Sequence, residues 1–177
     1  MKCVEMSAIN IKKVSLATML IALGVVISPF TWFVVPPSKA NPTQHLINAV
    51  SGVLLGPFWA GFIAFCIGII RMITGAGTIL SMPGGIPGGV VVGLLYWLLR
   101  KYARRYANLA ALTDPIGTLL IGVPLAVYIV APWANLSASL TVLSIGWFFS
   151  CVPGTILGFI VVMALQAAGF TRETFSR

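Results

Sequence analysis

Long stretches without a charged residue constrain this chain more than any other feature of its sequence. They cover residues 14–38, 40–70, 72–99 and 115–171 when His45 is counted as neutral. A helix needs about 20 apolar residues to cross the ~30 Å hydrocarbon layer of a bilayer. Only 8% of the residues are charged, against roughly 25% in a soluble domain. The sequence therefore predicts a polytopic membrane protein and excludes an ordinary soluble or disordered chain.

Proline and glycine divide these stretches into six predicted transmembrane helices. Ser28-Pro29 and Pro36-Pro37 mark the end of the first helix, and Gly56-Pro57 separates a short second helix from the third. The segment 75–85 (GAGTILSMPGG) predicts a non-helical outer loop. The expected helices cover about residues 14–30, 43–55, 57–74, 84–100, 109–131 and 138–168. We predict an all-α bundle that forms a single integral membrane domain over residues 1–177.

Basic residues predict the orientation, because cytoplasmic loops are enriched in Lys and Arg. With both termini inside (N-in, C-in), only Lys39 lies in an outer loop. The inner segments then hold Lys2, Lys12, Lys13, Arg100, Lys101, Arg104, Arg105, Arg172 and Arg177. The apolar run after Lys13 could alternatively belong to a cleaved signal peptide, but it is long for that role and Lys39 is awkward beside a cleavage site.

The composition leaves little room for catalysis. The chain has three acidic residues and one histidine, with no metal-ligand spacing and no P-loop. Ser–His–Asp catalysis would need Asp114, which we place near the cytoplasmic end of the fifth helix, whereas His45 is predicted at the opposite side. No basic stripe alternates with stacking aromatics. We predict no catalytic residue, no metal, no cofactor and no nucleic-acid partner.

Polar residues in the short second helix are the first binding candidates, since polar groups at membrane depth are costly and often functional. Gln44 and Asn48 are four residues apart, and His45 and Asn48 are three apart, so all three can face inward. Amides and an imidazole together offer donors and acceptors, which suits a small neutral polar heterocycle. The alternative is hydrogen bonding between helices for structure alone.

Arg71 is the only cation predicted inside a span. It either contacts a ligand or holds carbonyls of the 75–85 loop, which have no partner on the lipid side. Thr78 and Ser81 of that loop offer hydroxyls. Lys39, in the outer loop before the second helix, completes the polar candidates.

Aromatic residues gather toward the predicted outer half of the bundle: Trp32, Tyr128, Trp133 and Trp147. Aromatics at a membrane interface are commonly anchors, but one that faces inward could stack on a flat ring. Tyr128, Trp133 and Trp147 are therefore candidate ligand contacts, and Trp147 is the best of them.

Small residues repeat along the first helix, where Ser15, Thr18 and Ala22 are spaced by three and four positions. Such a stripe lets another helix approach closely. It predicts a docking surface for a partner protein, with packing inside the bundle as the alternative.

Several runs together resemble the ThiW family. They are residues 39–48 (KANPTQHLIN), 54–57 (LLGP) and 71–84 (RMITGAGTILSMPG), with 150–154 (SCVPG) as a less specific match. The resemblance extends over nearly the whole chain in length and number of spans, and its specific part is residues 39–84.

The resemblance implies a substrate-binding (S) component of an energy-coupling factor (ECF) transporter, multi-pass in a prokaryotic plasma membrane. Such components work with a transmembrane coupling protein and two cytoplasmic ATPases, and their first helix typically offers an Ala-x-x-x-Ala stripe, matched here by Thr18-x-x-x-Ala22. The implied substrate is hydroxyethylthiazole, a thiamine precursor, with the loop 31–42 closing over it. Two alternatives stay open: an S component for thiamine or another small heterocycle, and a structural or assembly protein without a ligand.

Overall fold

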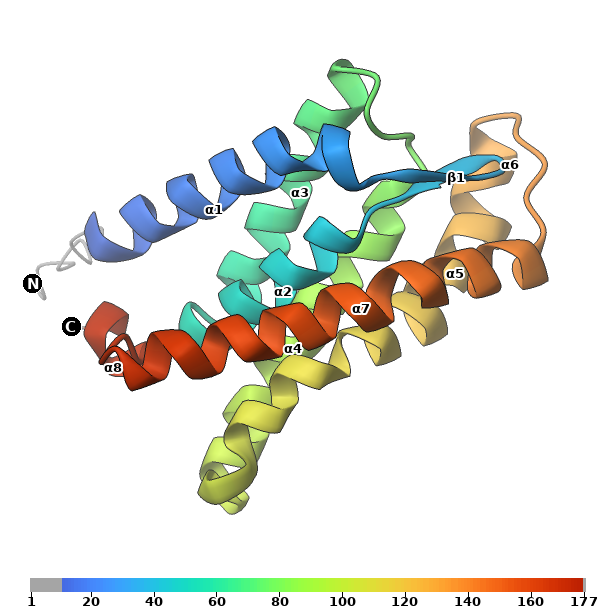
Figure 1. The fold of residues 1–177 in the computed structure, drawn as a ribbon. Helices are drawn as coiled ribbons and strands as arrows, with labels where there is room; N and C mark the ends of the chain where they lie inside the picture. Colours follow the sequence, from blue (N-terminus) through green and yellow to red (C-terminus); the bar gives the residue numbers. More distant parts are fainter. Residues whose placement is uncertain (1–10, 177) are drawn as a thin grey trace, which may run out of the picture.

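The computed structural model describes residues 11–176, so Lys2 and Arg177 of the predicted inner segments lie outside the described range. Its elements are α1 (Ile11–Thr31), β1 (Phe33–Val35), β2 (Ser38–Ala40), α2 (Pro42–Leu54), α3 (Pro57–Ile73), α4 (Ser81–Tyr102), the 3-10 helix η1 (Arg104–Thr113), the π-helix η2 (Ile116–Gly122), α5 (Val123–Leu125), the π-helix η3 (Ala126–Val130), α6 (Ala131–Trp133), α7 (Leu140–Ala167) and α8 (Arg172–Ser176). The segments η1 to α6 follow one another as one helical stretch. The start of α1 and α8 lie close together, with the β1–β2 hairpin at the far end (Figure 1).

The short helix α2 is the centre of the bundle. Eleven of its 13 residues are buried, and it contacts α1, α3, α4 and α7. Thirteen residues rise about 20 Å, which is less than the ~30 Å hydrocarbon layer. The helix begins at Pro42 and ends just before Gly56 and Pro57, so its length is set by the proline and glycine residues at its two ends. Its polar side chains are therefore held in the interior of the protein.

Glycine permits the close approach of the neighbouring helices to α2. A Cβ atom on Gly158 of α7 would lie 2.6 Å from Cβ of Ala49, and one on Gly52 of α2 would lie 2.6 Å from Cγ1 of Val92 in α4. Real Cβ atoms do not approach so closely, so the crossings of α2 with α7 and with α4 need glycine at these two positions.

The outer surface of the described chain suits lipid. Four helical stretches are long and apolar enough to cross a membrane: α1, α4, Ile116–Trp133 and α7, and α3 is a shorter apolar helix. Large apolar side chains such as Phe30, Phe58 and Leu120 are 85%, 80% and 71% exposed, far more apolar surface than a soluble monomer shows. These features support a polytopic membrane protein. Six spans and the N-in, C-in orientation stay predictions.

Two local expectations are wrong. Residues 33–40 form an antiparallel hairpin, with Phe33 opposite Ala40, so the chain is not purely α-helical. The second half of the 75–85 segment is helical, since Pro83 lies in the first turn of α4, where its missing N–H is not needed.

Candidate functional site

A buried hydrogen-bond network surrounds Asp114, whose side chain is 0% exposed. One carboxylate oxygen, Oδ2, lies 2.6 Å from His45 Nδ1 and accepts a hydrogen bond from Thr118 Oγ1 at 3.2 Å. The other, Oδ1, accepts from Asn48 Nδ2 at 2.7 Å. A buried carboxylate is tolerated only when such donors replace water. The network thus joins α2 to the part of the fifth helical stretch where η1 ends and η2 begins.

Asn48 is the branching point of this network. Its Nδ2 also donates to the Gly85 carbonyl at 2.9 Å, and its Oδ1 accepts from Gln44 Nε2 at 3.1 Å. Every polar atom of the Asn48 amide is therefore used, so its hydrogen bonds offset the cost of its complete burial. Gln44, His45 and Asn48 lie on a common side of α2, as their spacing predicts.

The prediction that Asp114 and His45 lie on opposite sides of the membrane is wrong, since the two side chains are in contact. The fifth helical stretch begins at Arg104, earlier than expected, and its first ten residues form the 3-10 helix η1. A 3-10 helix rises about 2.0 Å per residue, so the chain advances roughly 20 Å before it reaches Asp114. The carboxylate is consequently deep in the bundle.

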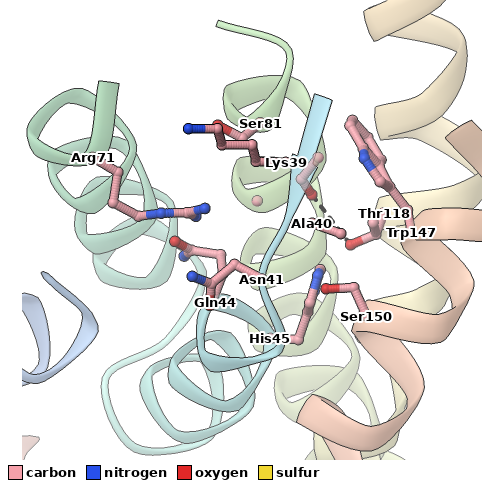
Figure 2. A pocket seen from close by; sticks show the side chains of 12 residues that line it. Lys39, Ala40, Asn41, Gln44, His45, Arg71, Ser81, Thr118, Trp147 and Ser150 are labelled. Carbon is pink, nitrogen blue, oxygen red and sulfur yellow. Dashed lines mark hydrogen bonds between the residues drawn. The ribbon is translucent and has the colours of Figure 1, made fainter. Parts of the chain in front are cut away.

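A small cavity of about 20 Å³, room for about one water molecule, borders this network at His45 and Thr118. Its walls come from the hairpin, α2, α3, α4, η2 and α7 (Figure 2). The lining residues are Lys39, Ala40, Asn41, Gln44, His45, Arg71, Ser81, Gly84, Gly85, Thr118, Trp147 and Ser150. In Figure 2, Arg71 is on one side of the space, and Trp147 and Ser150 are on the other.

Six of the predicted candidates line this cavity: Lys39, Gln44, His45, Arg71, Ser81 and Trp147. Asn48 lies behind it in the Asp114 network. Thr78 is outside the lining, and its Oγ1 lies 3.4 Å from Ser38 Oγ.

Two predicted aromatic contacts do not reach the cavity. Tyr128 is 67% exposed and Trp133 is 76% exposed, and neither lines this cavity. They lie on the outward side of the fifth helical stretch, where the alternative role of interface anchor fits them better. The hydropathy of that stretch could not show which side packs against the bundle.

The aromatic wall of the cavity is Trp147, which is only 4% exposed. A Cβ atom on Gly84 would lie 2.7 Å from Cζ3 of its indole ring. Glycine at this position of α4 therefore leaves the space that the ring occupies. The indole offers a flat apolar surface next to the polar side chains of α2.

Sequence reasoning missed Ser150 as a site residue. It lies one helical turn after Trp147 in α7, and this spacing of three was the signal that both face the same cavity. Within residues 11–176, three buried side-chain atoms have no hydrogen-bond partner: Ser150 Oγ, Arg71 Nε and Thr155 Oγ1. The first two belong to residues of the cavity wall.

The predicted docking residues Ser15, Thr18 and Ala22 are exposed. The opposite side of α1 holds its buried residues, which are Ala17, Leu20, Gly24 and Ser28. Internal packing therefore does not explain the stripe. Thr18 Oγ1 donates to the Val14 carbonyl at 2.9 Å, so its hydroxyl adds no unpaired polar group to this surface.

Comparison with protein-family models matches residues 14–168 to ThiW, described as a thiamine-precursor transporter protein. The chain belongs to the ThiW family. This confirms the resemblance seen in the sequence, and with the apolar helices it makes the chain a membrane component of a thiamine-precursor transporter. A comparison with curated proteins finds no significant match. In this ThiW protein, the cavity between α2 and α7 is the candidate substrate site.

Proposed function

We propose that this chain is the S component of an ECF-type importer in a prokaryotic plasma membrane and that it binds hydroxyethylthiazole in the cavity above the Asp114 network. The observation that carries the proposal is a cavity walled by buried polar groups, one of which, the Ser150 hydroxyl, has no partner in the described chain. A buried polar atom without a partner costs about 1–3 kcal/mol. A ligand that bonds to it recovers this cost, which supports a binding role over a purely structural one.

The chemistry of the wall suits a small flat heterocycle with a hydroxyl group. The thiazole ring would lie against the indole of Trp147, and its hydroxyethyl arm would reach Ser150 Oγ and the ring of His45. An ionised Asp114 can only accept, so a neutral His45 would donate from Nδ1, 2.6 Å away, and keep Nε2 as its free acceptor. The hydroxyl of the ligand can then donate to His45 while it accepts from Ser150.

Closure and energy coupling belong to the same proposal. Lys39 and Ala40 of the hairpin line the cavity, so movement of residues 31–42 would open the site to the ligand and close it again. The sequence contains no P-loop, and separate ATPases would supply the energy through a coupling protein docked on Ser15, Thr18 and Ala22. Ala22→Trp should then block assembly with the coupling protein and leave ligand affinity unchanged.

Calorimetric titration of the purified protein with hydroxyethylthiazole and with thiamine tests the substrate. The informative variant is Ser150→Ala, and its matched control is Thr155→Val, which removes another unpaired buried hydroxyl of α7 outside the cavity lining. We expect Ser150→Ala to weaken binding by about tenfold and Thr155→Val to leave it unchanged. If hydroxyethylthiazole does not bind at micromolar concentration, the proposed substrate is wrong. Stronger binding of thiamine would favour the alternative of an S component for thiamine.

A further inference from the structure

Arg71 is a buried cation with too few partners. It lies in the last turn of α3 and is 2% exposed. The hydrogen bond recorded for its guanidinium runs from Nη2 to the Ala76 carbonyl at 3.4 Å, and Nε has no partner in the described chain. Figure 2 shows the side chain reaching from α3 into the space bounded by Gln44 and Lys39. A buried charge is costly unless it is paired and hydrogen-bonded.

No carboxylate of residues 11–176 compensates this charge. Asp114 is engaged by His45, Asn48 and Thr118. Glu173 of α8 forms an ion pair with Arg100. Arg71 makes one long hydrogen bond to the 75–85 segment. This contact uses only one of the several N–H donors of the guanidinium, so binding that segment does not account for the rest.

A second cation lines the same cavity. Lys39 Nζ donates to the Gly75 carbonyl at 2.5 Å and lies 4.4 Å from the centroid of the Trp32 ring. These partners hold the ammonium in place, but neither of them carries a negative charge. The wall of the cavity therefore contains two cationic side chains and no acidic one.

We propose that the Arg71 side of the cavity is an anion subsite, and that the preferred ligand is a thiazole bearing an anionic group, either a phosphate monoester of its alcohol or a carboxylate. The thiazole part of this inference rests on the proposed function. The guanidinium matches the oxygens of such groups in a bidentate arrangement, and Lys39 adds a second positive charge. The ring then lies at Trp147, and the arm that carries the anionic group turns from Ser150 to Arg71 on the opposite side of the cavity.

Calorimetric titration with three probes tests the subsite: hydroxyethylthiazole, its phosphate monoester, and a thiazole carboxylate with the same ring. In the unaltered protein we expect at least one anionic probe to bind about tenfold or more tightly than the alcohol, as expected for a charge-assisted hydrogen bond. Arg71→Gln should abolish this preference, so that the anionic probes bind no more tightly than the alcohol. Arg71→Lys should retain part of it. The probe that gains more identifies the anionic group.

The outcomes separate this inference from the proposed function. If no probe binds, the proposed thiazole function fails. If the alcohol binds as tightly as both anionic probes, or if the preference survives Arg71→Gln, only the anion subsite is overturned. If Arg71→Gln fails to fold, titration in added chloride gives the second measurement. Chloride that occupies the subsite should weaken binding of the anionic probes and leave binding of the alcohol unchanged. Equal effects of chloride on all probes would contradict the subsite.

Discussion

Replacing Asp114 by Asn tests whether this carboxylate sets the hydrogen bonding that His45 presents to the ligand. The substitution keeps the size of the side chain but turns one acceptor into a donor. Because Asn48 Nδ2 donates to the other oxygen, the new amide keeps its oxygen there and turns its NH2 toward His45 Nδ1, 2.6 Å away. Nδ1 must then accept, which moves the imidazole hydrogen to Nε2. A ligand hydroxyl that donated to Nε2 would meet a donor instead.

The expected magnitudes follow from the partners of the carboxylate. In Asp114→Asn, charge-assisted hydrogen bonds are exchanged for neutral ones, at a cost of about 1–2 kcal/mol in the free energy of unfolding. In Asp114→Ala, the buried donors of His45, Asn48 and Thr118 lose their acceptor, so we expect a loss of about 3–5 kcal/mol. The reversed polarity at Nε2 should weaken ligand binding at least tenfold in Asp114→Asn.

The assay combines unfolding in detergent with calorimetric titration of hydroxyethylthiazole. Asn108→Ala is the matched control, because Asn108 and Gln166 exchange two amide hydrogen bonds of 2.7 and 2.9 Å outside the cavity lining. The control should lose about 1 kcal/mol of stability and keep its ligand affinity. If Asp114→Asn matched the unaltered protein in both measurements, or weakened binding no more than the control, the role assigned to Asp114 would be refuted.

Three further predictions use other parts of the structure. Trp147→Ala should weaken ligand binding about tenfold, whereas Trp133→Ala, at a 76% exposed position, should not; equal titration curves would contradict the stacking wall. Gly84→Ala should displace the Trp147 indole, shift its fluorescence emission and weaken binding, and an unchanged spectrum would argue against that contact. The pKa of Glu173 is lowered by a hydrogen bond from its own backbone and then by one from the Thr171 side chain. The ionised carboxylate therefore contributes its full stability above the ordinary Glu pKa, and this stability is lost as the pH falls through the lower native pKa. Glu173→Gln should therefore cost under about 1 kcal/mol in the free energy of unfolding at neutral pH, and it should reduce the fall of the unfolding midpoint at acid pH. An unchanged fall at acid pH would contradict this prediction.

Several features of the site could be predicted from sequence because they are local. The spacing of Gln44, His45 and Asn48 is enough to put three polar side chains on a common side of a helix. Pro42 and the Gly56-Pro57 pair bound the short helix that carries them. The position of Trp147 within an apolar run also made it the best aromatic candidate. Each of these inferences needs only the geometry of one helix.

The sequence by itself determined that the chain is a membrane protein, where its helices fall, and which short helix carries the polar residues, since apolar length and helix-breaking residues act over a few turns of chain. Only the tertiary structure decided that Asp114 meets His45 across 69 positions of sequence, that Ser150 joins the cavity, and that Tyr128 and Trp133 face away from it. These features depend on the depth at which each helix begins and on its rotation about its axis. Both are fixed by packing against the neighbouring helices, and hydropathy along a single segment does not encode them.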